Sequence, residues 1–318
     1  MSDIDQRFKF GTESSAKPNG FPEEEGVHKN HNQLVEGKNR QHRRTVGRVL
    51  RYGLLTIAAL IFAFPFYFMV IGAFQSNPTN TPSRLVPLSG WTFNNFVAIN
   101  GRINLWGSLL NSVIFVGGVL LGTVVFGLLA GYSLACLDFS GRGFTWILIL
   151  LVQTVPFQLL MIPLYVQITR SYGLGDNYIG MILPFAINTT AVFIFAQFFK
   201  SLPRSIFEAA RIDGASEIRI LWAIAIPMVR PALVTAILVT FIGPWNEFLW
   251  PFLITKDASM QPLAVSLANF ITTASQSMAN PNGAILAGAT VLAFPIIIIF
   301  CLFQKYFTAS DIGSATKG

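Results

Sequence analysis

The chain contains 318 residues, of which 53% are hydrophobic and only 12% are charged. Soluble domains carry roughly twice that charged fraction, so this composition and a mean hydropathy of +0.55 exclude an ordinary soluble domain and indicate an integral membrane protein. A net charge of +7 could indicate a protein that binds nucleic acid. Most Lys and Arg residues, however, flank apolar runs, which is typical of the charges that orient membrane spans.

The first 50 residues are polar, rich in Gly, Asn, Glu and Lys, and show no hydrophobic periodicity. Such a segment buries too little apolar surface to offset the entropy of ordering, so we predict a disordered cytoplasmic tail over 1–50. It ends in the basic run RQHRRTVGRVLR, Arg40 to Arg51. The apolar run that follows is too long for a signal-peptide core, which predicts an uncleaved membrane anchor.

A membrane-spanning helix needs about 20 mostly apolar residues. We therefore predict an all-α polytopic membrane protein with about six spans, at 52–74, 108–135, 145–168, 178–199, 229–252 and 285–304. With both termini in the cytoplasm, 18 of the 22 Lys and Arg residues lie inside, in accord with the positive-inside rule. Residues 51–310 then form one membrane domain, with a cytoplasmic tail at 311–318.

Two longer connections, 75–107 and 253–284, are predicted to be external loops because each joins two spans on the outer side. The two cysteines, Cys136 and Cys301, fall at predicted cytoplasmic ends of spans, where a disulfide is not expected. The histidines all lie in the N-terminal tail. Since no Cys and His residues cluster, we predict no metal site and no cofactor.

Proline recurs within the predicted spans. It removes a backbone donor and kinks a helix, which membranes tolerate where neighbouring helices or water satisfy the freed carbonyls. Each proline alone indicates bending, and together they suggest helices shaped around a path. These prolines are Pro65, Pro156, Pro163, Pro184, Pro244, Pro251 and Pro295.

Polar side chains inside the spans are candidates for a substrate path. Glu247 is the only carboxylate predicted well inside a span, where ionisable groups are costly and usually face a bundle interior or water. A path for a sugar would need aromatic rings, which stack on the apolar faces of the sugar, and polar side chains, which form hydrogen bonds with its hydroxyls. The candidates are Gln153, Gln158, Asn188, Trp245, Asn246 and Glu247.

A second interpretation of the same residues is structural. Gln and Asn join helices through hydrogen bonds in many membrane bundles, and Trp245 and Trp250 could be interfacial anchors. Glu247 could pair with a partner subunit. The sequence leaves both interpretations open.

Residues 203–227, which we term the charged segment, interrupt the apolar pattern. Pro203 suits a helix start, and apolar or small residues then recur at three- and four-residue spacing. Asp213-Gly214 is predicted to break this helix and start a second, with Asp213 as its cap. The result is two short helices against the inner membrane surface.

The first of these helices has features of a docking surface. Ala209 and Ala210 have little bulk, so a partner surface can approach the backbone. Glu208 offers one charge to an external Arg or Lys. A charged group on a short rigid helix transmits force better than a loop does.

The charged segment resembles the cytoplasmic signature of ABC importer permeases, with Ile in place of Leu at 226. The matching positions are Glu208-Ala209-Ala210, Gly214, Ile224, Ile226 and Pro227. The wider sequence resembles the carbohydrate-uptake branch, specifically the smaller permease of the maltose-transporter type, over about residues 50–310. The stretches that carry this likeness are Asn111-Ser112, FFKSLP at 198–203, IDGAS at 212–216 and WNEFLWP at 245–251.

In that family the permease has no ATPase of its own, and this sequence contains no G-x-x-x-x-G-K-[ST] motif. The resemblance implies two separate ATP-binding subunits, a second permease, an extracytoplasmic binding protein and the lipid bilayer as partners, and no nucleic acid. The loop at 253–284 would reach into the binding protein. ATP-driven closure would switch the permeases by alternating access.

The resemblance also implies which residues couple the permease to its ATPase. The helix Glu208–Gly214 would dock into a groove on one ATP-binding subunit. The implied coupling residues are Glu208, Ala209, Ala210, Arg211, Asp213 and Gly214.

Two other classes compete with this interpretation. An ion-coupled secondary transporter or channel would need intramembrane charge, for which Glu247 alone is thin support, and no internal repeat stands out. A membrane enzyme would need a cluster of His, Asp or Ser residues that the predicted spans lack.

Overall fold

The computed structural model describes residues 25–76, 90–273, 277–278 and 281–315, and within them regular structure is helical. One isolated β-bridge joins Gln75 and Trp91. The chain divides into two compact units, residues 1–65 and 66–318. The predicted all-α class is confirmed.

The helix α1 (Glu25–Ala73) contains 49 residues, and its part from Gly47 to Ala73 is apolar and long enough to cross a membrane. The structure differs from the predicted disorder over residues 25–50, because the helix continues there. Extending an existing helix adds one hydrogen bond per residue, and Glu, Lys, Gln and Arg are good helix formers. Residues 1–24 lie outside the described part.

The remaining membrane helices belong to the second unit. Two are long and apolar: α3 (Leu105–Cys136) and the part of α14 (Pro281–Ala315) up to Phe303. Three bent pairs of helices are also long and apolar enough to cross a membrane. In the first, Arg142–Thr154 (α4) meets Phe157–Ser171 (α5 and η2) at 94°. In the other two, Tyr178–Phe185 (α6 and η3) meets Thr189–Lys200 (α7) at 50°, and Glu217–Met228 meets Arg230–Trp245 (α11) at 78°. If each pair is one span, the described helices provide six, as predicted.

The bends occur where the backbone hydrogen bonding of a helix is interrupted. Val155 is extended before Pro156, since a residue preceding proline disfavours the helical conformation. Asn188 caps α7 by accepting a hydrogen bond from the Ala191 N–H at 3.1 Å. The predicted continuous span over 229–252 is wrong, because α11 ends at Trp245 and α12 (Leu249–Ile254) begins after a break.

The connections predicted as external loops contain helices. In 75–107 lies α2 (Asn94–Ile103), and in 253–284 lie the short η5 (Ala258–Met260) and α13 (Leu263–Thr272). Residues 77–89, 274–276 and 279–280 of these connections lie outside the described part.

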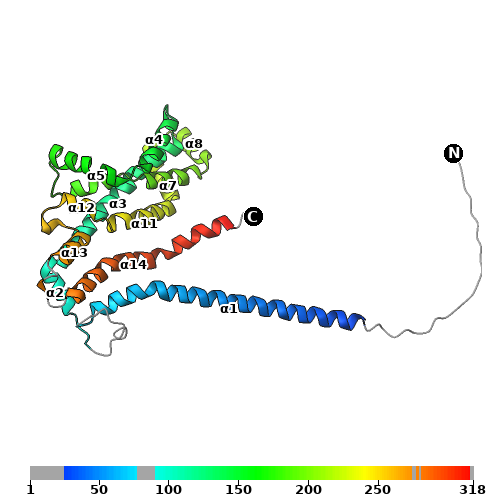
Figure 1. Cartoon of the computed structure of the whole chain (residues 1–318). Coiled ribbons are helices and arrows are strands. Elements are labelled where there is room, and N and C mark those ends of the chain that lie inside the picture. Colours follow the sequence, from blue (N-terminus) through cyan, green and yellow to red (C-terminus); the bar gives the residue numbers. More distant parts are fainter. Residues whose placement is uncertain (1–24, 77–89, 274–276, 279–280, 316–318) are drawn as a thin grey trace, which may run out of the picture. The chain divides into compact units, whose positions relative to one another are not determined.

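The helix α3 runs through the second unit from α2 and α13 at one end to α4 and α8 at the other (Figure 1). Two glycines let neighbouring helices approach it closely. A Cβ added at Gly131 would lie 2.7 Å from the Phe195 Cβ, and one at Gly122 would lie 2.9 Å from the Ala186 carbonyl oxygen. Small residues are typical of close packing between membrane helices, so α3 is held tightly along its length.

Candidate functional site

The charged segment folds into α8 (Arg204–Ile212), α9 (Glu217–Ile220), η4 (Leu221–Ala225) and α10 (Ile226–Met228). A tight turn ends α8. The N–H of Gly214 donates to the Arg211 carbonyl and the N–H of Ala215 donates to the Ala210 carbonyl, both at 3.0 Å. This is a Schellman motif, and it requires the left-handed conformation of Gly214, with φ of 81°.

The predicted cap of the second helix is corrected by the structure. Asp213 is the C-terminal flanking residue of α8. Ser216 caps α9, because its Oγ accepts a hydrogen bond from the Arg219 N–H at 3.4 Å. The Schellman turn needs two more residues before the chain can start a new helix, which moves the cap from Asp213 to Ser216.

One face of α8 is buried and the other is exposed. Phe207 and Ala210 belong to the core that α8 shares with α3, α7 and α11. Glu208 and Ala209 are exposed, and Ile212 is 86% exposed. Ala210 packs inward, so of the two alanines only Ala209 lies on the exposed face.

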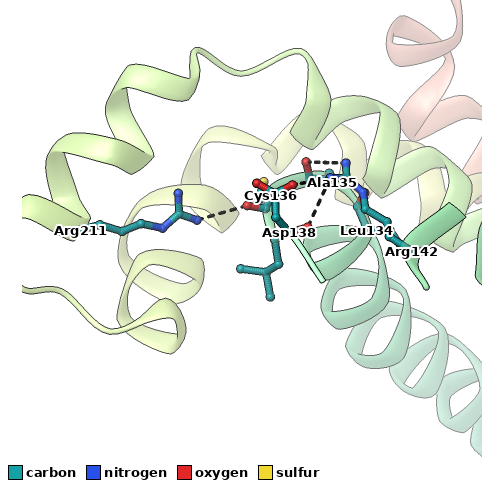
Figure 2. A network of polar contacts seen from close by, with 7 residues as sticks. Leu134, Ala135, Cys136, Asp138, Arg142 and Arg211 are labelled. Carbon is teal, nitrogen blue, oxygen red and sulfur yellow. Dashed lines mark hydrogen bonds and ion pairs between the residues drawn. The ribbon is translucent and has the colours of Figure 1, made fainter. Parts of the chain in front are cut away.

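Two arginines hold the C-terminal end of α3. The Arg142 Nε donates to the Leu134 carbonyl at 2.9 Å, and its two terminal nitrogens donate to the Ala135 and Leu137 carbonyls at 3.3 Å. The Arg211 guanidinium donates to the Cys136 carbonyl at 3.2 Å. Figure 2 shows both guanidinium groups reaching the end of α3. Carbonyls at a helix C-terminus lack partners in the helix and attract cations.

Glu217 links this helix end to the charged segment. Its Oε1 accepts a hydrogen bond from the Arg211 Nε at 2.6 Å. Its Oε2 accepts one from the Tyr132 hydroxyl at 2.7 Å. We term Tyr132, Arg142, Arg211 and Glu217 the α3 clamp.

The ion pair of the α3 clamp also stabilises the charged form of its arginine. The hydrogen bond to the Glu217 carboxylate raises the pKa of Arg211. A cavity of about 290 Å³ opens beside the pair. Its charged lining residues are Asp138, Arg142, Lys200, Arg204, Glu208 and Arg211. Within the described part of the chain Glu208 has no hydrogen bond or ion pair, so its carboxylate is available to a partner.

The candidate path residues fall into two groups. On the facing helices α4 and α7, the Gln153 Nε2 donates to the Thr190 hydroxyl at 3.1 Å, close to Asn188. Gln158 is exposed on α5. The ring of Phe157, which precedes Gln158, packs edge-on against the Trp250 ring of α12, with 5.9 Å between the ring centroids.

The other path residues lie at the break between α11 and α12. Trp245 is 3% exposed and its indole donates to the Leu292 carbonyl at 3.0 Å. Asn246 is exposed and donates to the Ile242 carbonyl. Glu247 is half-buried and accepts a hydrogen bond from the Trp250 N–H at 3.2 Å. The carboxylate therefore sits at a helix break and not inside a continuous span.

A polar network at the N-terminal end of α3 was missed by the sequence analysis. The Asn111 Nδ2 donates to the carbonyls of Ser259 and Gln261 at 2.7 and 3.1 Å. The Tyr178 hydroxyl donates to the Asn111 Oδ1 at 2.7 Å. The Ser108 hydroxyl donates a hydrogen bond to the Ser266 Oγ, and the Ser112 Oγ accepts one from the Leu263 N–H. We term Ser108, Asn111 and Ser112 with these partners the α3 N-terminal network.

Sequence reasoning also missed the link from Glu217 to Tyr132, since these residues are 85 positions apart. Tyr132 stands in a long apolar run and carries no visible sign of a partner. The one available signal was a tyrosine hydroxyl near the end of a span, which needs a hydrogen-bond partner when buried.

Comparison with known proteins decides the family. The model of the binding-protein-dependent transport system inner membrane components matches residues 123–310. The chain belongs to this family.

Individual relatives agree with this assignment. The arabinooligosaccharides transport system permease protein AraQ of Halalkalibacterium halodurans is 32% identical over 273 residues, covering 83% of this chain and 96% of the relative. The sn-glycerol-3-phosphate transport system permease protein UgpE of Yersinia pestis is 29% identical over 269 residues, covering 82% and 94%.

A solved structure gives the same result. A bacterial ABC transporter involved in the import of the acidic polysaccharide alginate contains a chain that is 25% identical, with a TM-score of 0.72, covering 82% of this chain and 96% of that one. The resemblance seen in the charged segment is thus confirmed, and this family member is a permease of the ABC importer type. The comparisons support this interpretation over an ion-coupled transporter or channel.

Proposed function

We propose that this permease carries a sugar or oligosaccharide across the cytoplasmic membrane, with a second permease forming the other half of the path. Two separate ATP-binding subunits drive it, and an extracytoplasmic binding protein delivers the substrate. Both termini lie in the cytoplasm, which follows the distribution of Lys and Arg. The names of the relatives, which transport arabinooligosaccharides and sn-glycerol-3-phosphate, support a small polyhydroxylated substrate.

The observation that carries this proposal is the exposed face of α8. Glu208 has no partner within the described residues, and Ile212 is 86% exposed. We take the unpaired carboxylate and the apolar side chain one helical turn away as part of the surface that the partner covers. The Schellman turn and the α3 clamp hold this face in place, so docking requires little ordering. Arg211, Asp213 and Gly214 would then shape the docking helix, and Ala209 would let the partner approach.

For the substrate path we propose the polar residues on the bent helices. Gln153, Gln158 and Asn246 are exposed, while Asn188 and Glu247 are half-buried. Amides and a carboxylate suit sugar hydroxyls, which both donate and accept hydrogen bonds. Trp245 is buried and would support this path by packing.

The test is copurification of this chain with candidate ATP-binding subunits, followed by uptake into liposomes that contain the whole complex and its binding protein. Glu208→Lys should abolish copurification or uncouple ATP hydrolysis from uptake. Asp257→Lys makes the same charge change at the exposed residue that caps η5 and should leave copurification unchanged. Uptake without any ATPase, driven by an ion gradient, would contradict the proposal.

Substrate identity needs a separate experiment. The reconstituted complex should be assayed with a panel of labelled monosaccharides and oligosaccharides. Gln158→Ala should raise the substrate concentration needed for half-maximal uptake, while the ATP hydrolysis rate without substrate stays the same. An identical concentration dependence would remove Gln158 from the path.

A further inference from the structure

We propose that the α3 clamp is the link through which movement of the charged segment reaches α3, with Tyr132 and Glu217 as positioning residues for coupling. This inference rests on the proposed function, because it assumes that α8 docks to an ATP-binding subunit. It adds the route by which docking acts on the membrane helices.

The covalent route from α8 to the next membrane helix is poorly suited to transmit force. It passes through the Schellman turn at Gly214, then α9, then five residues of π-helix in η4. The helical pair Glu217–Met228 and Arg230–Trp245 is bent by 78°. Turns and π-helical segments interrupt the regular hydrogen bonding of a helix, so movement along this route can be absorbed at several points.

The route through space is shorter and more direct. Both oxygens of Glu217 are engaged, one by Arg211 at 2.6 Å and the other by the Tyr132 hydroxyl at 2.7 Å. Arg211 also reaches the Cys136 carbonyl at 3.2 Å. Arg211 lies on α8, Glu217 begins α9, and Tyr132 and Cys136 lie in the last turns of α3. Charge-assisted hydrogen bonds of this kind are short and directional.

Apolar packing supports the same connection. The Tyr132 ring lies edge-on to Phe199 of α7 at 5.5 Å and to Phe207 of α8 at 6.3 Å, and the residue is 3% exposed. Tyr132 therefore meets α8 through a ring contact and meets α9 through its hydroxyl. Removing only the hydroxyl would break the polar link and keep the ring packing, which makes the two contributions separable.

The helix that receives this movement also reaches the other end of the second unit. A 32-residue helix is roughly 48 Å long. At its N-terminal end Asn111 holds the backbone of Ser259 and Gln261. Movement applied at Tyr132 would therefore be carried by α3 to the connection between α12 and α13.

The experiment measures the ratio of substrate transported to ATP hydrolysed in the reconstituted complex. Tyr132→Phe should copurify with the ATP-binding subunits and hydrolyse ATP, but its ratio should fall by about tenfold, the scale set by one hydrogen bond to a carboxylate. The matched control is Tyr172→Phe, which removes a hydroxyl that accepts a bond from Gln167 at 2.9 Å on an exposed part of the chain. Its ratio should equal that of the unmodified protein.

A purely structural role would lower the amount of assembled complex and leave the ratio unchanged. An unchanged ratio in Tyr132→Phe therefore overturns the inference. If Tyr132→Phe does not assemble, the same ratio of substrate transported to ATP hydrolysed is measured in Glu217→Gln, which keeps the side-chain shape. An unchanged ratio in that variant overturns the inference as well. If the unmodified chain binds no ATP-binding subunit, the proposed function fails instead, so the two failures are distinguishable.

Discussion

The two ends of α3 are both tied to distant parts of the chain, but by different chemistry. At the C-terminal end the ties are charged, and the Arg211 and Glu217 side chains remain 37% and 41% exposed. At the N-terminal end the ties are neutral, and Ser108, Asn111 and Ser112 are only 2–4% exposed. Charged side chains make the contacts at the C-terminal end, where water still solvates them. Amides and hydroxyls make the contacts at the N-terminal end, where burying a charge would cost free energy.

This difference predicts that the two ends contribute differently to the free energy of unfolding. Exposed ion pairs contribute little stability and respond to salt, so breaking the ties at the C-terminal end should cost little free energy of unfolding. Buried hydrogen bonds are expensive to leave unmade, so the ties at the N-terminal end should stay intact when α3 moves.

The largest expected effect is at the neutral end. Asn111→Ala would leave two backbone carbonyls and the Tyr178 hydroxyl without their partner, which should lower the free energy of unfolding by about 2 kcal/mol. Thermal unfolding in detergent measures this. Asn246→Ala removes an exposed amide and serves as the control. Equal melting temperatures for the two variants would contradict the assigned difference between the ends.

A smaller effect is expected at the charged end. Arg211→Met breaks the pair with Glu217, and because both side chains are more than a third exposed, the loss should be at most about 1 kcal/mol. It should disappear at about 1 M salt, where the screening length falls to about 3 Å. Arg219→Met, at an exposed position of the same segment, is the matched control. A salt-independent loss would mean that the pair behaves as a buried one.

The smallest effect is expected at the rim of the α3 clamp. Asp138 pairs with Arg142 at 3.0 Å, but its side chain is 95% exposed. Arg142 would still hold three carbonyls of α3, so Asp138→Asn should leave the melting temperature unchanged. A clear drop would show that the carboxylate, and not the helix end, orients Arg142.

The sequence predicted the number of spans and the charged segment because both have local signals. Apolar runs of the right length mark the spans, and Pro203 and Gly214 mark the start and the turn of α8. The positions of the bends were not predicted. Proline shows that a helix can bend, but the 94° angle after Thr154 depends on neighbours that are distant in sequence.

The α3 clamp and the α3 N-terminal network were not predictable for a different physical reason. Asn111 and Ser259 are 148 positions apart, and Tyr132 and Glu217 are 85 apart. Such contacts leave no periodicity along the chain. In the sequence Arg142 is only one of the 18 Lys and Arg residues predicted to lie inside. A basic residue next to an apolar run gives the same sequence pattern whether its side chain faces water or binds the carbonyls of a helix end.

The most direct test of this account is whether the charged segment and the end of α3 move as one body. Spin labels can be placed at Ser140, just after α3, and at Ser205 on α8, both of which are exposed, in a Cys136→Ser, Cys301→Ser background. The distance between them should stay the same when ATP binds to the assembled complex, and should change or broaden in Tyr132→Phe. A shift of several ångströms on ATP binding with the clamp intact would contradict the account.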